Sequence, residues 1–390
     1  MLIRLNALRV LAEACVVDHH LRTRPDMVYD ILSGEISSDL MSFFFVLSGF
    51  VAMYSSSSND GVTTLDYITK RLRKTLLLYL IVTVIGCVDA QVRRWVVAEN
   101  QLICGYLDFV LLSPWFPCRH PPYFNGSGWY LCTLYWLWLC FPFLRERLVC
   151  CKHAWRFATL AYLLNVCLFS VVWVPQWTWM VRGFPPLRLF EFCIGMLAAT
   201  TVQHRQVPTY LALCSGCLIV GYWILACAYL VRKPILWQWE EVPENFQSVV
   251  DTTMVPYPNT DVIHETRLPL MQGKFALLWA VIIQWTACSE LRAECDSWWV
   301  QWLDSTVFKL LSPFSLQLYL CHPWIPRGVH SLLRLIGLEG VIAIHMEFLF
   351  TYTICYMIWL WGQPVLDRLS RVAVVDVELV EKPLLSILHQ

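Results

Sequence analysis

Long apolar runs recur along the whole chain and decide its fold class. Each covers roughly 15 to 25 residues, the length that a helix needs to cross about 30 Å of hydrocarbon. The composition agrees, because 57% of the residues are hydrophobic, 15% are charged and the mean hydropathy is +0.53. We therefore predict an all-α, polytopic membrane bundle of about ten transmembrane helices. The runs lie near residues 5–21, 38–54, 75–90, 128–144, 157–175, 187–203, 208–231, 273–288, 306–323 and 338–362.

Basic residues between the runs set the expected orientation. Cytoplasmic loops of membrane proteins are enriched in Lys and Arg. If both termini are cytoplasmic, most basic clusters fall on one side, and Arg22, Arg24, Arg93 and Arg94 are the exceptions. The prediction is an integral, multi-pass protein surrounded by membrane lipids, without an indication of which membrane. The supporting clusters are Arg4; Lys70, Arg71, Arg73 and Lys74; Arg145, Arg147, Lys152 and Arg156; His204 and Arg205; and Arg368 and Arg371.

We expect a single domain over residues 1–390, with its transmembrane core at 5–363. Residues 232–272 combine acidic side chains with prolines and predict a polar extramembrane loop, either a lid or acceptor-binding element or a solvated insertion. Residues 364–390 are expected to form a short cytoplasmic tail. The net charge of zero gives no electrostatic reason to expect a nucleic-acid partner.

Most of the cysteines lie inside apolar runs, where a free thiol behaves as a small hydrophobe, so we expect no metal or redox site. Cys104 and Cys118 differ, because both fall in a predicted loop and could pair in an oxidising lumen. Asn125-Gly126-Ser127 is a formal glycosylation sequon. It abuts the fourth run, and we expect it not to be used.

The first run, LNALRVLAEACVVDHHL, is unusually polar for a transmembrane segment. On a helix turning about 100° per residue, Asn6, Arg9, Glu13 and His20 fall on one face. A central Arg costs roughly 2.5 to 3.5 kcal/mol on insertion scales, so this face should meet protein or a water-filled cavity. It is either part of a functional site or a set of polar groups that satisfy one another between packed helices.

Five stretches resemble the integral-membrane acyltransferase family 3, whose members O-acylate sugars and small molecules. The first run resembles the family's first helix, in which a His follows an Arg after ten residues, here Arg9 and His20. The other stretches are FFFVLSGF from Phe43 to Phe50, KRLRK from Lys70 to Lys74 with Tyr79 after it, SPFSLQLYLCHP from Ser312 to Pro323, and VELVEKPL from Val377 to Leu384. Together they cover nearly the whole chain and suggest its eukaryotic, fungal branch.

The chain also departs from the family pattern. Bacterial members have an Asp six residues before the Ser of the second string, where this chain has Ser42; Asp39 lies one helical turn earlier and could substitute in position but not in register. The Glu expected after Trp129 and Leu131 is replaced by Leu134 and Tyr135. These losses put in doubt any mechanism that needs those two carboxylates.

The resemblance implies transfer of an acyl group, acetyl in the first instance, from acyl-CoA (acetyl-CoA) to a hydroxyl of a small molecule, lipid or glycan. A base must take the hydroxyl proton, and a neutral imidazole suits that near neutral pH. His20 is the first candidate; alternatively His322 is the base or a transient acyl carrier and His20 positions the acceptor. Both are expected near the outer ends of their helices. Glu13 is the expected partner of Arg9.

Acyl-CoA is expected as a donor substrate and no cofactor as tightly bound. Its phosphates need cations that the cytoplasm can reach, and Arg71, Arg73 and Lys70 are the candidates; the simpler interpretation is a cluster obeying the positive-inside rule. Ser42, Ser48 and Gly49 are small residues that let membrane helices approach closely, and Ser48 also belongs to the second string. Arg188 and Glu191 are expected to form an intramembrane ion pair.

Two other functions remain open. The polar face of the first run could line the path of a transporter or channel, although no inverted halves are evident. The lost carboxylates would also suit a catalytically inactive scaffold of the same fold.

Overall fold

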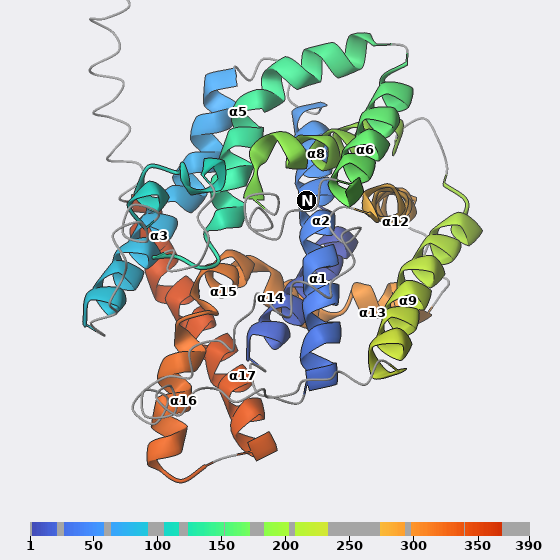
Figure 1. The fold of residues 1–390 in the computed structure, drawn as a ribbon. Helices are drawn as coiled ribbons and strands as arrows, with labels where there is room; N and C mark the ends of the chain where they lie inside the picture. The colour runs from blue at the N-terminus through green and yellow to red at the C-terminus, as the bar shows by residue number, and fades with distance from the viewer. Residues whose placement is uncertain are drawn as a thin grey trace, which may run out of the picture.

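A computed structural model describes residues 2–21, 27–57, 64–92, 105–116, 124–151, 153–171, 183–202, 207–232, 274–292, 298–338 and 340–368. Within these ranges the regular structure is helical and no strand occurs, which confirms the all-α class (Figure 1). The elements are α1 (Ile3–Leu21), α2 (Met27–Ser57), α3 (Thr64–Val92), η1 (Ser113–Trp115), α5 (Trp129–Cys150), α6 (Ala154–Val171), α8 (Pro185–Val202), α9 (Thr209–Arg232), α12 (Ala276–Leu291), α13 (Trp298–Leu303), α14 (Thr306–Leu311), η4 (Ser312–Phe314), α15 (Ser315–Cys321), α16 (Ile325–Leu335), α17 (Gly340–Met357) and the π-helical η5 (Ile358–Gly362).

Helix α2 runs through the centre of the molecule and packs closely on α8 (Figure 1). Two glycines permit this approach. A Cβ on Gly49 would lie 2.0 Å from the Phe192 carbonyl oxygen, and one on Gly195 would lie 1.9 Å from that of Val46. Both distances are far below van der Waals contact, so neither position accepts a larger residue without helix separation. The prediction that small residues of the second run allow close packing is confirmed at Gly49.

The ten-span arrangement is not confirmed. Among the described residues, one helical stretch, Asp39–Ser56, is both long and apolar enough to cross a membrane. Two further stretches, Thr209–Leu225 and Ala276–Leu291, are apolar but shorter.

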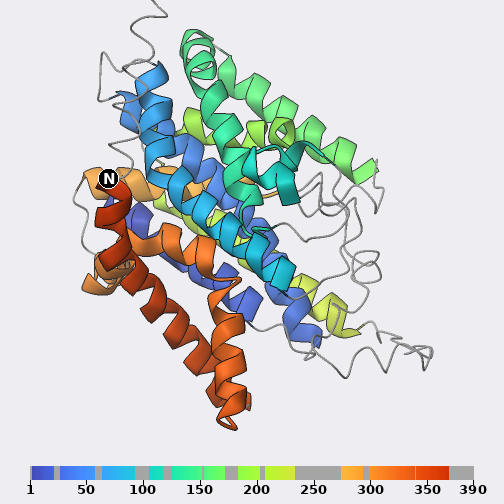
Figure 2. The same ribbon diagram turned by 90° about the vertical axis from the view of Figure 1, so that its left-hand side faces the viewer.

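The ninth apolar run departs from the predicted single helix over 306–323. It consists of α14, η4 and α15, and a turn after Cys321 leads into α16. Two prolines interrupt it: Pro313 lies at the start of η4 and Pro323 follows His322, and proline cannot donate a backbone hydrogen bond. His322 therefore caps a short helix in the chain's interior path, followed by the antiparallel hairpin of α16 and α17 (Figure 2).

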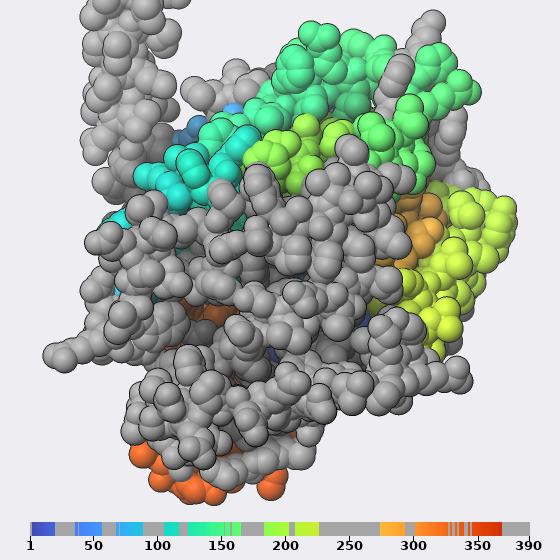
Figure 3. All heavy atoms as spheres, in the orientation of Figure 1, coloured from blue at the N-terminus to red at the C-terminus, as the bar shows by residue number. Residues whose placement is uncertain are grey.

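Apolar side chains are abundant on the outside of the molecule. Helices α6 and α9 lie at the edge of the face shown in Figure 3. Leu160 of α6 is 66% exposed, and Leu213 and Leu225 of α9 are 60% and 71% exposed. Extended apolar surface of this kind marks contact with lipid or with another protein.

Candidate functional site

Arg9 and Glu13 lie one helical turn apart on α1 and form the first part of the site. The Arg9 guanidinium donates a 2.9 Å hydrogen bond to the carbonyl oxygen of Ser312 in η4. Glu13 is 3% exposed, and neither of its carboxylate oxygens has a hydrogen-bond partner within the described residues. The two side chains interact electrostatically, and the carboxylate also faces Ser315 at the start of α15. The predicted pairing is thus a through-space interaction, while the hydrogen bond of Arg9 goes elsewhere.

Tyr130 of α5 adds a hydroxyl to this pair. Its oxygen lies 2.9 Å from Ser48 Oγ and 3.3 Å from the Phe44 carbonyl oxygen, both on α2. Because a carbonyl only accepts, the Tyr130 hydroxyl donates to Phe44 and accepts from Ser48. Tyr130 also interacts electrostatically with Arg9 and Glu13. The structure therefore brings the predicted Ser48 next to the polar face of α1 through a tyrosine that sequence reasoning missed.

His322 joins the same region through Tyr319. The Tyr319 ring centroid lies 5.4 Å from that of Tyr130 and 5.9 Å from that of His322. His322 is 1% exposed, and its Nδ1 lies 2.7 Å from the Tyr319 carbonyl oxygen. Since that carbonyl can only accept, Nδ1 carries the hydrogen, and in the neutral ring Nε2 holds the lone pair. His322 is thus held in the tautomer in which Nε2 is the basic nitrogen.

A hydrogen-bond network fixes the Tyr319–His322 turn from the segment before α5. The Tyr319 hydroxyl donates to the Ser127 carbonyl oxygen at 2.6 Å, and the Ser127 hydroxyl lies 3.3 Å from the Leu320 carbonyl oxygen and 3.2 Å from Asn125 Oδ1. The Asn125 backbone N–H donates to Asp108 Oδ2 at 3.3 Å. Asn125 is completely buried, which suits a structural asparagine and not a glycosylated one.

Asp108 is the one carboxyl of this network and lies outside the apolar runs, in the short helix 105–109. It is completely buried. Burial raises the pKa of the Asp108 carboxyl to about 7, against the smaller opposing effect of hydrogen bonds from Ser113 and the backbone of Asn125 and Phe124. The carboxyl carbon's own backbone carbonyl accepts a 2.9 Å hydrogen bond from Tyr79, the tyrosine that follows the basic string.

The predicted coenzyme-binding residues lie at the other end of α3. Arg71 is half-buried, donates to Ser55 Oγ at 3.5 Å and lies over the Trp138 ring at 5.6 Å. Arg73 is exposed. Lys70 belongs to α3, but its side chain falls outside the described part of the chain. No contact between Arg71 or Arg73 and the polar face of α1 occurs among the described residues.

Asp39 belongs to a different cluster, on α2, α8, α9 and α12. It accepts a hydrogen bond from Trp223 Nε1 at 2.9 Å and pairs with Lys274 Nζ at 3.2 Å. Nearby, Arg188 and Glu191 form a 2.7 Å ion pair in which both side chains are 3% exposed. The predicted intramembrane ion pair is therefore confirmed, and Asp39 is placed with Lys274 and not with Arg9.

Several predicted features fall outside the described residues. His20 lies in the last turn of α1, but its side chain is not among the described ones. Cys104, Cys118, the loop 232–272 and the tail beyond residue 368 are likewise outside them. The described residues that sequence reasoning missed are Tyr130, Tyr319, Ser127 and Asp108; a hydroxyl or carboxyl beside a predicted helix end was the only local signal.

The fold and site together define an all-helical protein that encloses a polar cluster of Arg, Glu, Tyr, Ser and His side chains. A family model described as an acyltransferase domain matches residues 2–361. The chain belongs to acyltransferase family 3, as the sequence resemblance predicted. No curated protein and no solved structure matches it.

Proposed function

We propose that this protein is a membrane-embedded O-acyltransferase that moves an acyl group, acetyl in the first instance, from acyl-CoA to a hydroxyl of a small molecule, lipid or glycan. The observation that carries the proposal is the enclosed cluster of Arg9, Glu13, Tyr130 and His322 in a chain of this family. In this reaction the acceptor oxygen attacks the thioester carbonyl, the C–S bond breaks, and the hydroxyl proton passes through a base to the departing thiolate.

An imidazole is the proposed base. His322 has the required tautomer, because its Nδ1–H is bound to the Tyr319 carbonyl and Nε2 can accept a proton. His20 is the second candidate, since it shares the face of α1 that carries Arg9. We propose that one of the two takes the proton and the other positions the acceptor.

Arg9 is the proposed stabiliser of the tetrahedral intermediate. One terminal nitrogen is held by Ser312, and Nε is buried without a hydrogen-bond partner in the described part of the chain. A fixed cationic donor with a spare N–H can stabilise the negative charge that develops on the thioester oxygen. Glu13 and the Ser48–Tyr130 pair hold the surroundings of this guanidinium in place.

We propose that the coenzyme approaches from the cytoplasmic side, where Arg71, Arg73 and Lys70 bind its phosphates. Contacts between segments that the ten-span topology assigns to that side support this orientation. Arg71 bonds to Ser55, Arg145 donates to the Ser56 carbonyl at 3.4 Å, and Arg4 pairs with Asp304 at 3.0 Å. The ten-span membrane bundle with cytoplasmic termini is part of this proposal.

The test is transfer of label from acetyl-CoA to an acceptor extract by membranes that contain the protein. We expect His322→Ala or His20→Ala, whichever removes the base, to lower the rate about 10²- to 10⁴-fold. Arg9→Ala should lower it to a similar degree. His345→Ala, at an exposed histidine of α17, is the matched control and should leave the rate unchanged. Wild-type activity in all three site variants would refute the proposal.

A further inference from the structure

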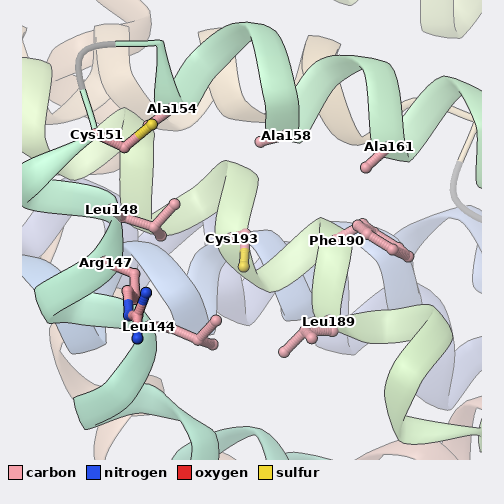
Figure 4. Close-up of a pocket in the computed structure, with 10 residues that line it drawn as sticks. All are labelled: Leu144, Arg147, Leu148, Cys151, Ala154, Ala158, Ala161, Leu189, Phe190 and Cys193. Carbon is pink, nitrogen blue, oxygen red and sulfur yellow. The ribbon is translucent and has the colours of Figure 1, made fainter.

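A groove lies between α5, α6 and α8, apart from the polar cluster (Figure 4). Its volume is about 300 Å³, which is at the lower end for small-molecule sites. Its walls are apolar or sulfur-containing except for one arginine. The lining residues are Leu144, Arg147, Leu148, Cys151, Ala154, Ala158, Ala161, Leu189, Phe190 and Cys193.

Small side chains open this groove. Ala154, Ala158 and Ala161 follow one another at helical spacing along one face of α6, so no bulky group fills the gap toward α8 (Figure 4). Cys193 presents a small side chain from α8. Pro142 lies inside α5 just before the lining segment, and a proline at that position bends a helix away from its neighbours. The hollow is thus written into the sequence of three helices.

One end of the groove is cationic. Arg147 is exposed, and its guanidinium carbon lies 5.1 Å from the Phe143 ring centroid. Figure 4 shows the guanidinium beside Leu144 and Leu148 on α5, at the edge of the groove. The flanking surface is apolar, because Phe143 is 62% and Leu160 66% exposed. An apolar slot that ends at a cation, set in an apolar surface, has the polarity of a lipid: hydrocarbon along its length and an anion at one end.

We infer that this groove binds an acyl chain of an anionic phospholipid, with the phosphate-bearing headgroup at Arg147. Charge complementarity selects the anionic lipid over a zwitterionic one, because a basic side chain near the membrane surface attracts anionic headgroups. The apolar walls select a lipid chain over a polar ligand, which would leave its hydrogen bonds unmade there. The site rests on membrane embedding and not on catalysis.

The experiment measures lipid retention by native mass spectrometry of the purified full-length protein, titrated with phosphatidylglycerol or phosphatidylcholine. Wild type should bind phosphatidylglycerol more tightly. Arg147→Gln should weaken that binding about fivefold and remove the preference, whereas Arg156→Gln, at an exposed arginine outside the groove, should not. Ala158→Phe should fill the groove and weaken binding of both lipids. Ala212→Phe replaces an equally buried alanine of α9 (8% exposed in each case) and serves as its control.

Three results would overturn the inference: equal binding of the two lipids by wild type, an unchanged preference in Arg147→Gln, or a dimer that dissociates in Ala158→Phe, which would assign the groove to a second copy of the chain. If Ala158→Phe does not fold, Arg147→Gln still decides, because an exposed side chain can be exchanged without disturbing the core. None of these measurements uses transferase activity, so failure here leaves the proposed function standing.

Discussion

Two buried glutamates of this protein follow an arginine on the same helix, and they are used in opposite ways. Glu191 lies three residues after Arg188 and pairs with it at 2.7 Å. Glu13 lies four residues after Arg9, yet Arg9 donates to the Ser312 carbonyl and the Glu13 oxygens have no hydrogen-bond partner in the described part of the chain. The spacing on the helix permits a pair in both cases. What differs is that a broken helix, at η4, offers Arg9 a backbone acceptor.

The difference separates a structural charge from an available one. Buried polar groups are normally satisfied, and an unsatisfied one needs an explanation such as a catalytic role. The Arg188–Glu191 pair supports the packing of α8 against α2 and α6 and has little left to offer a ligand. Glu13 and Arg9 keep bonding capacity that a substrate could complete. Variants at the two pairs should therefore affect different properties.

The largest effect is expected at the closed pair. Arg188→Ala leaves the Glu191 carboxylate buried without its cation, and breaking a buried pair in this way costs about 3–5 kcal/mol of unfolding free energy. Denaturant unfolding in detergent would measure it. Arg156→Ala, at an exposed arginine, is the control and should change stability by less than about 0.5 kcal/mol. Equal losses in the two variants would mean that the pair contributes nothing beyond surface charge.

Asp108 provides a buried carboxyl without a neighbouring cation among its interactions, and so extends the comparison. Its folded pKa of about 7 lies above that of an unfolded Asp, near 3.9. Between these values the folded state holds a proton that the unfolded state has released, so stability falls as the pH rises from about 4 to 7. Asp108→Asn should remove this part of the slope, worth a few kcal/mol in total.

The measurement is the unfolding free energy of wild type minus that of Asp108→Asn across pH 4–8. The difference should become more negative as the pH rises to about 7 and then level off. A difference independent of pH would show that Asp108 does not hold a proton in the folded state.

A smaller, functional effect is expected at the open pair. Glu13→Gln removes a charge but no hydrogen bond, so stability should change little, while acyl transfer should fall about tenfold, or 1.4 kcal/mol of transition-state stabilisation. Glu191→Gln is the matched variant and should lose stability instead. Both are assayed by unfolding and by transfer from labelled acetyl-CoA. A large loss of stability in Glu13→Gln with unchanged specific activity would reverse the distinction between the pairs.

Local features of the sequence predicted the features that depend on neighbouring residues. The all-α class followed from apolar run length, the Arg188–Glu191 pair from helical spacing, and the role of Gly49 from its small side chain. The prediction of one continuous ninth helix was wrong because apolarity was weighed above the two prolines, Pro313 and Pro323.

Contacts between distant runs were not predictable from the sequence. Asp39 pairs with Lys274 and Ser48 with Tyr130, across 235 and 82 positions of the chain, counting 274 − 39 and 130 − 48. No periodicity within a run specifies which helix will face it, because many arrangements bury the same apolar surface. The polar face of α1 was visible in the sequence, but the tyrosines that complete it came from packing.

The smallest effect, and the sharpest test of that packing, is expected at Tyr130. Tyr130→Phe deletes the hydroxyl that accepts from Ser48 and donates to Phe44, which should cost about 1 kcal/mol of stability. Tyr135→Phe is its matched control: the Tyr135 hydroxyl also makes a 2.9 Å bond, to Thr75 Oγ1, but one turn further along α5 and without an interaction with Arg9 or Glu13. Both variants should lose similar stability, and only Tyr130→Phe should slow acyl transfer, about fivefold. Equal activities would place Tyr130 with the closed pair as a structural residue, and the open cluster would then reduce to Arg9, Glu13 and the histidines.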